Sequence, residues 1–237
     1  MRRAYADALV GWRDALRACR LMLNDVMQFA EGRRAIVPPA QYIYLRSPYG
    51  LHNIRGLGRA PKAGEPWNFV TNWLVAGPFP LEWDGASKTT PTGFDRAYAP
   101  EAKFDSCATF DTVDGPGPWR YVDTDLTGRL DFLRHFATTE NVVGYARCRV
   151  IAPTDMDTTF SLGSNDGARV WVNGQDVFAW SSVAQGGRGA QPHQNEFPVH
   201  LKAGENVVLV KVENLGANWQ LYLSANDPTR VLRFQAP

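Results

Sequence analysis

Cysteine is scarce in this sequence. The three cysteines, Cys19, Cys107 and Cys148, are odd in number and lie far apart. A fold that depends on several disulfides, or a metal knuckle built on CxxC, needs more cysteines or closer spacing. Both are therefore excluded, and a single bridge between Cys107 and Cys148 stays open.

An excess of charge of one sign is missing as well. The 25 basic and 24 acidic residues leave a formal net charge of +1. Because an even balance creates no long-range field to attract phosphates, nucleic acid is a poor partner. Charged side chains also interrupt every apolar stretch of residues 1–32, which predicts neither a secretory signal nor a membrane span there. We expect either a cytoplasmic protein, or a piece of a longer exported protein whose export signal lies elsewhere.

Familiar catalytic motifs are absent. The sequence contains no GxSxG elbow, HExxH pair, Walker loop or GxGxxG fingerprint. Carboxylates are plentiful, but the sequence places no two of them at the separation that glycoside hydrolysis requires. We therefore expect that the chain is not an enzyme.

Apolar residues and turn formers are abundant. The chain is 44% hydrophobic with 8 Trp, enough for a packed core, and its 21 Gly and 16 Pro favour many short connections. Helical periodicity over residues 3–31 predicts an amphipathic helix within 1–32, which packs on its own domain or docks on another chain. Residues 33–68, rich in Pro, Gly and Arg, predict an irregular connector that wraps a surface.

Short alternating segments follow from residue 69 to residue 226. Asn173-Gly174 lies between two of them and is typical of a type I′ hairpin. Residues 140–226 leave no room for crossover helices, which excludes a parallel sheet. The fold class predicted is mainly β, an antiparallel jelly-roll-like β-sandwich, with residues 227–237 as a C-terminal tail.

Several segments appear in the order of a known family. They are "WLVAGPFP", "GFDRAYAPE", "GYARCRVIAP", "LGSNDGARVWVNGQDVF" and "LKAGENVVLVKVENLGANWQLYL". Over about residues 70–226 the chain resembles the galactose-binding-like β-sandwich modules that are appended to bacterial glycoside hydrolases, polysaccharide lyases and large secreted proteins. The "SNDGARVWVNG" portion is also similar to the PA14 domain. The resemblance implies a non-catalytic carbohydrate-binding or accessory module of an extracellular or cell-surface protein.

The resemblance also implies a calcium site. Sugar-binding PA14 members hold Ca²⁺ with an Asp-Asp pair, and here the pair is Asn165-Asp166. One formal charge fewer should lower the affinity for calcium. The alternative is an Asx-turn in which Asp166 satisfies its own loop and Gly167 supplies an unusual φ. Asp95, with Glu101 and backbone carbonyls, is a second candidate for a structural Ca²⁺ site of the kind these sandwiches carry.

The loop over residues 179–196 is the main candidate for ligand binding, because it is too long and polar to serve only as a connection. Sugars stack their C–H faces on aromatic rings and pair their hydroxyls with amides and guanidinium groups. The alternative is a scaffold in which Arg188 ties loops together. The predicted carbohydrate-binding residues are Trp180, Arg188, Gln191, His193 and Gln194.

A second function stays open beside carbohydrate binding. In it, the sandwich is a rigid scaffold, and the helix within 1–32 and the connector 33–68 mediate contacts between subunits. The partners expected are therefore a glycan, or a neighbouring protein domain or subunit.

Overall fold

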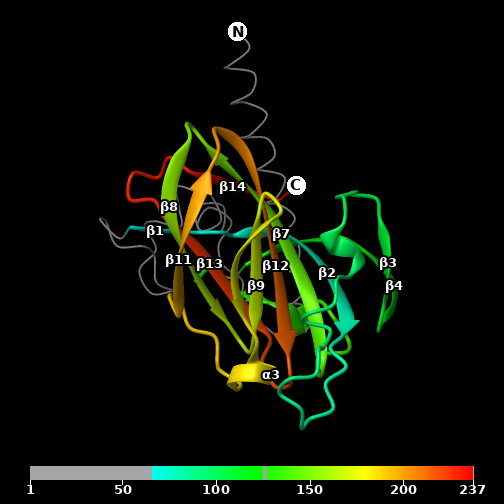
Figure 1. Ribbon diagram of the computed structural model, residues 1–237. Coiled ribbons are helices and arrows are strands. Elements are labelled where there is room, and N and C mark those ends of the chain that lie inside the picture. The colour runs from blue at the N-terminus through cyan, green and yellow to red at the C-terminus, as the bar shows by residue number, and fades with distance from the viewer. Residues whose placement is uncertain (1–65, 125–126, 237) are drawn as a thin grey trace, which may run out of the picture. The chain divides into compact units, whose positions relative to one another are not determined.

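The computed structural model describes residues 66–124 and 127–236, and these residues form an antiparallel β-sandwich (Figure 1). The predicted mainly-β fold class is confirmed. The helix predicted within residues 1–32 and nearly all of the connector 33–68 lie outside the described residues. Among the described residues, no helix is long and apolar enough to cross a membrane.

Two sheets face each other, and we call them sheet A and sheet B. Sheet A has the order β1-β13-β8-β11, with β6 paired to β13; sheet B has the order β10-β9-β12-β7-β2-β5, with β14 paired to β7. Sheet A consists of β1 (Trp67–Phe69), β6 (Leu130–Asp131), β8 (Met156–Ser164), β11 (Asn195–Leu201) and β13 (Gln220–Asn226). Sheet B consists of β2 (Asn72–Pro80), β5 (Arg120–Asp123), β7 (Val142–Ala152), β9 (Ala168–Val172), β10 (Gln175–Trp180), β12 (Gly204–Asn214) and β14 (Arg233–Gln235).

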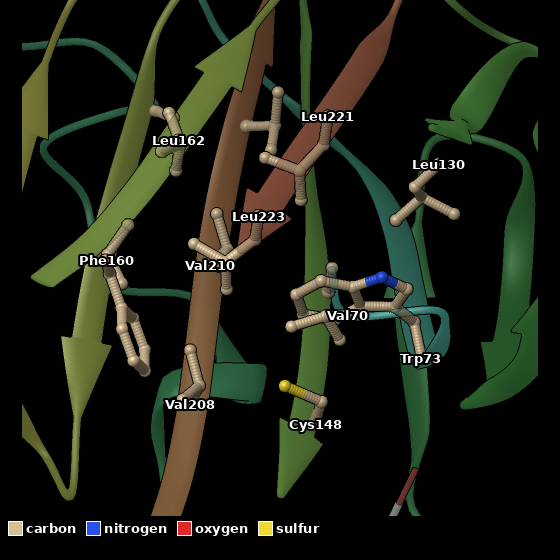
Figure 2. Packing of buried hydrophobic residues seen from close by; sticks show 14 of the residues in the cluster. Val70, Trp73, Leu130, Cys148, Phe160, Leu162, Val208, Val210, Leu221 and Leu223 are labelled. Atoms are coloured by element: carbon tan, nitrogen blue, oxygen red, sulfur yellow. The ribbon is translucent and has the colours of Figure 1, made fainter. Parts of the chain in front are cut away.

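The core fills the gap between the two sheets. Alternate residues of each strand point inward, so that Phe160 and Leu162 of β8 meet Val208 and Val210 of β12 (Figure 2). Trp219 is fully buried and stacks on Phe132, with ring centroids 4.9 Å apart. This alternation is the pattern from which the sandwich was predicted.

Both described cysteines are free thiols. Cys148 of β7 is buried in the core, whereas Cys107 is exposed, so no bridge joins them (Figure 2). Burial raises the pKa of the Cys148 thiol, which keeps it protonated and makes it behave as a small apolar residue.

The outer face of sheet B carries a second apolar cluster. The segment after β2 crosses this face and contributes Leu81, Phe94, Phe110 and Trp119, which pack against Tyr145 of β7 and its neighbours. The segment contains the 3-10 turn η1 (Ala99–Glu101) and the hairpin of β3 (Thr109–Thr112) and β4 (Gly115–Pro118). The sandwich therefore has a covered outer face on sheet B.

Local structure agrees with the sequence in some places and departs from it in others. Asn173 and Gly174 have φ of +53° and +80° and close the β9–β10 hairpin as predicted. Strand β2 passes through Gly77-Pro78, a pair typical of a strand end, and continues to Pro80, because a register shift between Ala76 and Phe79 accommodates the proline. One short helix, α3 (Ser182–Gln185), lies within the segment 179–196 that was predicted to be a loop.

Candidate functional site

Arg188 fastens the loop between β10 and β11 to the turn after β8. Its guanidinium donates from Nη2 to Ser164 Oγ at 3.0 Å and from Nη1 to Asn195 Oδ1 at 2.6 Å. Its Nε donates to the carbonyl oxygen of Asp166 at 3.2 Å. The same guanidinium covers the Trp180 ring, with Cζ 4.5 Å from the ring centroid. Arg188 and Trp180 thus contact each other, and the arginine has the loop-tying role of the scaffold alternative.

Gln194 holds the same loop from its other end. Its Oε1 accepts from Ser164 N at 2.9 Å, and its Nε2 donates to the carbonyl of Gly189. The loop backbone lies directly on sheet A, because a Cβ on Gly163 would stand 1.8 Å from the carbonyl oxygen of Gln191. Only glycine permits this approach. Gln194 is therefore a positioning residue within the loop.

His193 lies apart from Trp180, against sheet A. Its ring packs at a tilt against Trp67, with centroids 4.7 Å apart and an interplanar angle of 33°, and the ring centroid of Phe69 lies 5.6 Å away. Its Nδ1 is 2.8 Å from Ser161 Oγ. Since β1 pairs with β13 and β13 with β8, these groups come together on the outer face of sheet A.

The three rings are partly exposed, and Gln191, two residues before His193, is exposed. We call Trp67, Phe69, Gln191 and His193 the sheet A platform. It combines two residues of the predicted site with two that the sequence assigned to other segments. Trp67 and Phe69 were missed because they stand at the border of the connector, although "WNFV" alternates as a strand does.

Two buried carboxyl groups lie beneath the loop. Asp166 has a φ of +56° and its Oδ2 accepts from Leu215 N at 2.8 Å, so it fixes the end of β12 and not only its own turn. Glu213 accepts from the backbone N–H groups of Ser182 and Val183 at the start of α3. Burial raises the pKa of Asp166, and burial together with the nearby Asp166 raises the pKa of Glu213 to about 7.

Paired carboxyls with raised pKa values are also found in glycosidases. Here Asp166 is 5% exposed and Glu213 is fully buried, and the Glu213 carboxylate accepts from the Ser182 and Val183 N–H groups of α3 and from the Ser181 hydroxyl. A glycan cannot reach them while α3 is in place. Gly167 lies between the two, and a Cβ there would stand 2.1 Å from Glu213 Oε1. Glycine is required at position 167 because the Glu213 carboxylate lies so close to it, and not because of the unusual φ that the sequence suggested.

Asp95 and Glu101 are separated by a buried ammonium group. Lys211 Nζ lies 2.8 Å from Glu101 Oε1 and donates to the carbonyl oxygens of Phe94 and Arg96 at 3.1 and 2.6 Å. The Asp95 carboxylate accepts from Thr92 N at 3.0 Å. The protein's own lysine thus supplies the positive charge that the predicted calcium ion would bring between Glu101 and these carbonyls.

Calcium binding by Asn165, Asp166 and Asp95 stays a prediction. Within residues 66–124 and 127–236, no group of three or more His, Cys, Asp or Glu side chains is arranged to hold a metal ion. Asp166 is bonded to backbone donors, and the Arg188 guanidinium is close enough to lower its pKa in part. A hard cation requires several oxygen ligands, and this donor set does not fit one.

No family model matches the chain, and neither does any curated protein. Among solved structures, a family 35 carbohydrate-binding module from an environmental isolate is 17% identical, over 42% of this chain and 77% of that module, with a TM-score of 0.32. Another from Clostridium thermocellum is 20% identical, over 36% and 71%, with a TM-score of 0.27. The PA14 domain of the MpAFP antifreeze protein is 10% identical, over 40% and 53%, with a TM-score of 0.28.

At such TM-scores the likeness assigns no site residue and no ligand to this chain.

Proposed function

We propose that the sandwich is a non-catalytic carbohydrate-binding module that binds a glycan at the sheet A platform. The observation that carries the proposal is the tilted packing of His193 against Trp67, with ring centroids 4.7 Å apart, on the outer face of sheet A. Sugar rings have apolar C–H faces that pack on aromatic rings, and hydroxyls that need donors and acceptors. The aromatic rings of the platform offer a surface for the C–H face, and Gln191 and His193 offer donors and acceptors for the hydroxyls.

The loop that carries Gln191 and His193 is held before any ligand arrives. Arg188 fastens it to Ser164 and Asn195, and Gln194 fastens it to Ser164 and Gly189. A ligand then does not have to order the loop, which reduces the free-energy cost of binding. In this proposal Arg188, Gln194 and Trp180 position the site, and Gln191 and His193 contact the sugar.

The role that follows is that of an accessory module, which keeps an attached activity close to a polysaccharide. We place it in a secreted or cell-surface protein or assembly, on the strength of the sequence resemblance. No reaction is assigned to it, because the two carboxyls with strongly altered environments are buried beneath α3.

A glycan array probed with the whole chain tests the proposal, followed by calorimetric titration of each glycan that binds. Trp67→Ala and His193→Ala should each weaken binding by about tenfold or more, equivalent to about 1.4 kcal/mol. Tyr121→Ala is the matched control, since this ring is 51% exposed on β5 of the other sheet. Circular dichroism checks that each variant is folded. If no glycan binds, or if folded Trp67→Ala and His193→Ala bind as the wild type does, the proposal is wrong.

A further inference from the structure

A concave surface lies on the opposite side of the sandwich from the platform. It is a cleft of about 230 Å³ between η1 and the β3–β4 hairpin. In Figure 1 this hairpin lies at one side of the molecule, and β1 and β8 lie at the other. We call this concave surface the 99–119 cleft. Its principal lining residues are Pro100, Lys103, Phe104, Asp105, Phe110 and Trp119.

The deep walls of the cleft are aromatic. Trp119 packs edge-on against Phe110, with centroids 5.4 Å apart at 90°, and Phe104 lies 5.9 Å from Trp119 at 56°. Trp119 and Phe110 are buried, whereas Phe104 is partly exposed. The volume is below the ~300–1,000 Å³ of sites for drug-sized ligands. One small ring fits such a space.

These walls are fixed to the sheet beneath them. Glu101 ends η1 and is paired with the buried Lys211 at 2.8 Å, which holds that wall in place. Just after η1, Phe104 is held by the Arg147 guanidinium, whose Cζ lies 4.2 Å from the ring centroid and whose Nε is buried without a hydrogen bond. The cleft is thus preformed, as ligand sites usually are.

The rim of the cleft is polar. Lys103, Asp105 and Thr109 are exposed and offer an ammonium donor, a carboxylate acceptor and a hydroxyl group. A sugar ring can use both the aromatic wall and the polar rim, because its C–H face packs on the wall and its hydroxyls form hydrogen bonds with the rim. An apolar peptide side chain would fill the wall but leave both charged groups unused.

We propose that the 99–119 cleft is a second binding site, which takes a single neutral sugar ring. Phe104 packs on the ring, Lys103 donates to a hydroxyl oxygen, and Asp105 accepts from a hydroxyl. The inference shares its class of ligand with the proposed function but uses none of the platform residues. With two sites on opposite sides, one module engages two glycan chains, and binding to a dense polysaccharide surface gains from the second contact.

Cys107 offers a reporter for the test, because it is exposed and lies between Asp105 and Ala108, which both line the cleft. In a Cys19→Ser chain, an environment-sensitive dye attached to Cys107 is titrated with the methyl glycosides of glucose, galactose, mannose and xylose. Saturation-transfer NMR on the unlabelled chain is the second measurement. At least one glycoside should bind saturably in the NMR experiment and change the fluorescence of the dye.

Phe104→Ala and Asp105→Asn should each weaken this binding by about tenfold or more. Asp105→Asn keeps the oxygen that accepts from Cys107 N, so it tests the rim without disturbing the turn. Trp67→Ala should leave the signal unchanged, which separates the cleft from the platform. The proposal is overturned if no glycoside binds in the NMR experiment, or if binding survives both cleft variants. It is also overturned if N-acetylphenylalaninamide binds there and the glycosides do not, since the cleft would then be a pocket for a protein side chain.

Discussion

Lys211 lies within 2.8 Å of Glu101 and is 1% exposed, so an ammonium group is fully buried beneath the segment that covers sheet B. Two backbone carbonyls complete its hydrogen bonds, and the Tyr98 and Tyr145 rings stand 5.5 and 5.3 Å from Nζ. Burial lowers the pKa of Lys211 and the ion pair with Glu101 opposes that shift. The pair ties η1, and with it one wall of the 99–119 cleft, to β12.

Replacing this lysine should be costly. Lys211→Met leaves the Glu101 carboxylate with only the Tyr145 hydroxyl as a donor and leaves two carbonyls without a donor, and we expect a loss of about 3–5 kcal/mol in the free energy of unfolding. Lys211→Met combined with Glu101→Gln should lose less than the sum of the two single changes. Urea denaturation measures both.

Glu205→Gln is the control for that experiment. Glu205 is 50% exposed on its side chain and pairs with Arg149, so its loss should cost less than about 1 kcal/mol. A Lys211→Met protein as stable as the control variant would show that the buried pair does not hold the segment.

The contribution of Glu213 to the stability of the sandwich should fall as the pH rises from about 4.5 to about 7, whereas His135, whose pKa burial lowers, contributes in the opposite direction. Burial raises the pKa of Glu213 from 4.5 to about 7, so in this interval the folded protein keeps a proton that the unfolded chain releases. The difference corresponds to about 3 kcal/mol of stability that is present below pH 4.5 and lost above pH 7. Asp166 has a pKa raised by burial too, and it adds to the trend in the same direction.

Glu213→Gln should remove most of this pH dependence, because an amide keeps the shape and an acceptor oxygen but carries no charge. At pH 8 the variant should be more stable than the wild type, and Glu213→Ala should be less stable. Urea unfolding at a series of pH values checks the slope, with Glu205→Gln as a variant that leaves it unchanged. A Glu213→Gln stability that changes between pH 5 and pH 8 as that of the wild type does would contradict the assignment.

Replacing Arg188 by alanine or by lysine should destabilise the protein. Lysine can keep one hydrogen bond but not the fork that reaches Ser164 and Asn195, nor the contact of the guanidinium with the Trp180 ring. We expect the free energy of unfolding to fall by about 2–4 kcal/mol in Arg188→Ala and by most of that amount in Arg188→Lys.

Hydrogen exchange of the backbone amides should rise first in residues 181–194. Arg134→Ala is the control, since Arg134 is 63% exposed and makes a single local ion pair; equal exchange in the Arg188 and Arg134 variants would argue against a fastening role.

Much of the fold could be predicted, because strand alternation is a local signal. The two faces of β8 and the Asn173-Gly174 hairpin follow from neighbouring residues alone. The passage of β2 through Gly77-Pro78 could not be predicted in this way. The proline is tolerated there because the pairing of β2 with β7 shifts register, and register depends on a partner strand some 65 residues away.

The candidate site was predicted only in part, because side chains from distant segments complete it. His193 and Gln191 were predicted from the polarity of their loop, but Trp67 joins them through the pairing of β1 with β13 at the far end of the chain. Lys211 lies within an apolar strand, and its neighbours in the sequence do not predict that it pairs with Glu101. A charge buried by tertiary contacts leaves no periodic trace in the sequence.

Gly163 provides the sharpest test of the loop, because a single methyl group there would collide with it. A Cβ at Gly163 would stand 1.8 Å from the carbonyl oxygen of Gln191, and backbone cannot yield as a flexible side chain does. Gly163→Ala should therefore lift residues 189–194 from sheet A, and we expect an unfolding free energy lower by about 1–3 kcal/mol. Binding at the platform should fall by about tenfold or more, since His193 would no longer lie against Trp67.

Gly189→Ala in the same loop is the matched control for Gly163→Ala, because its Cβ would meet nothing within 4 Å. Calorimetric titration with a bound glycan and urea unfolding of both variants give the two readings. If Gly163→Ala behaves as Gly189→Ala does in both, the loop does not rest on the sheet, and the platform is not assembled as described.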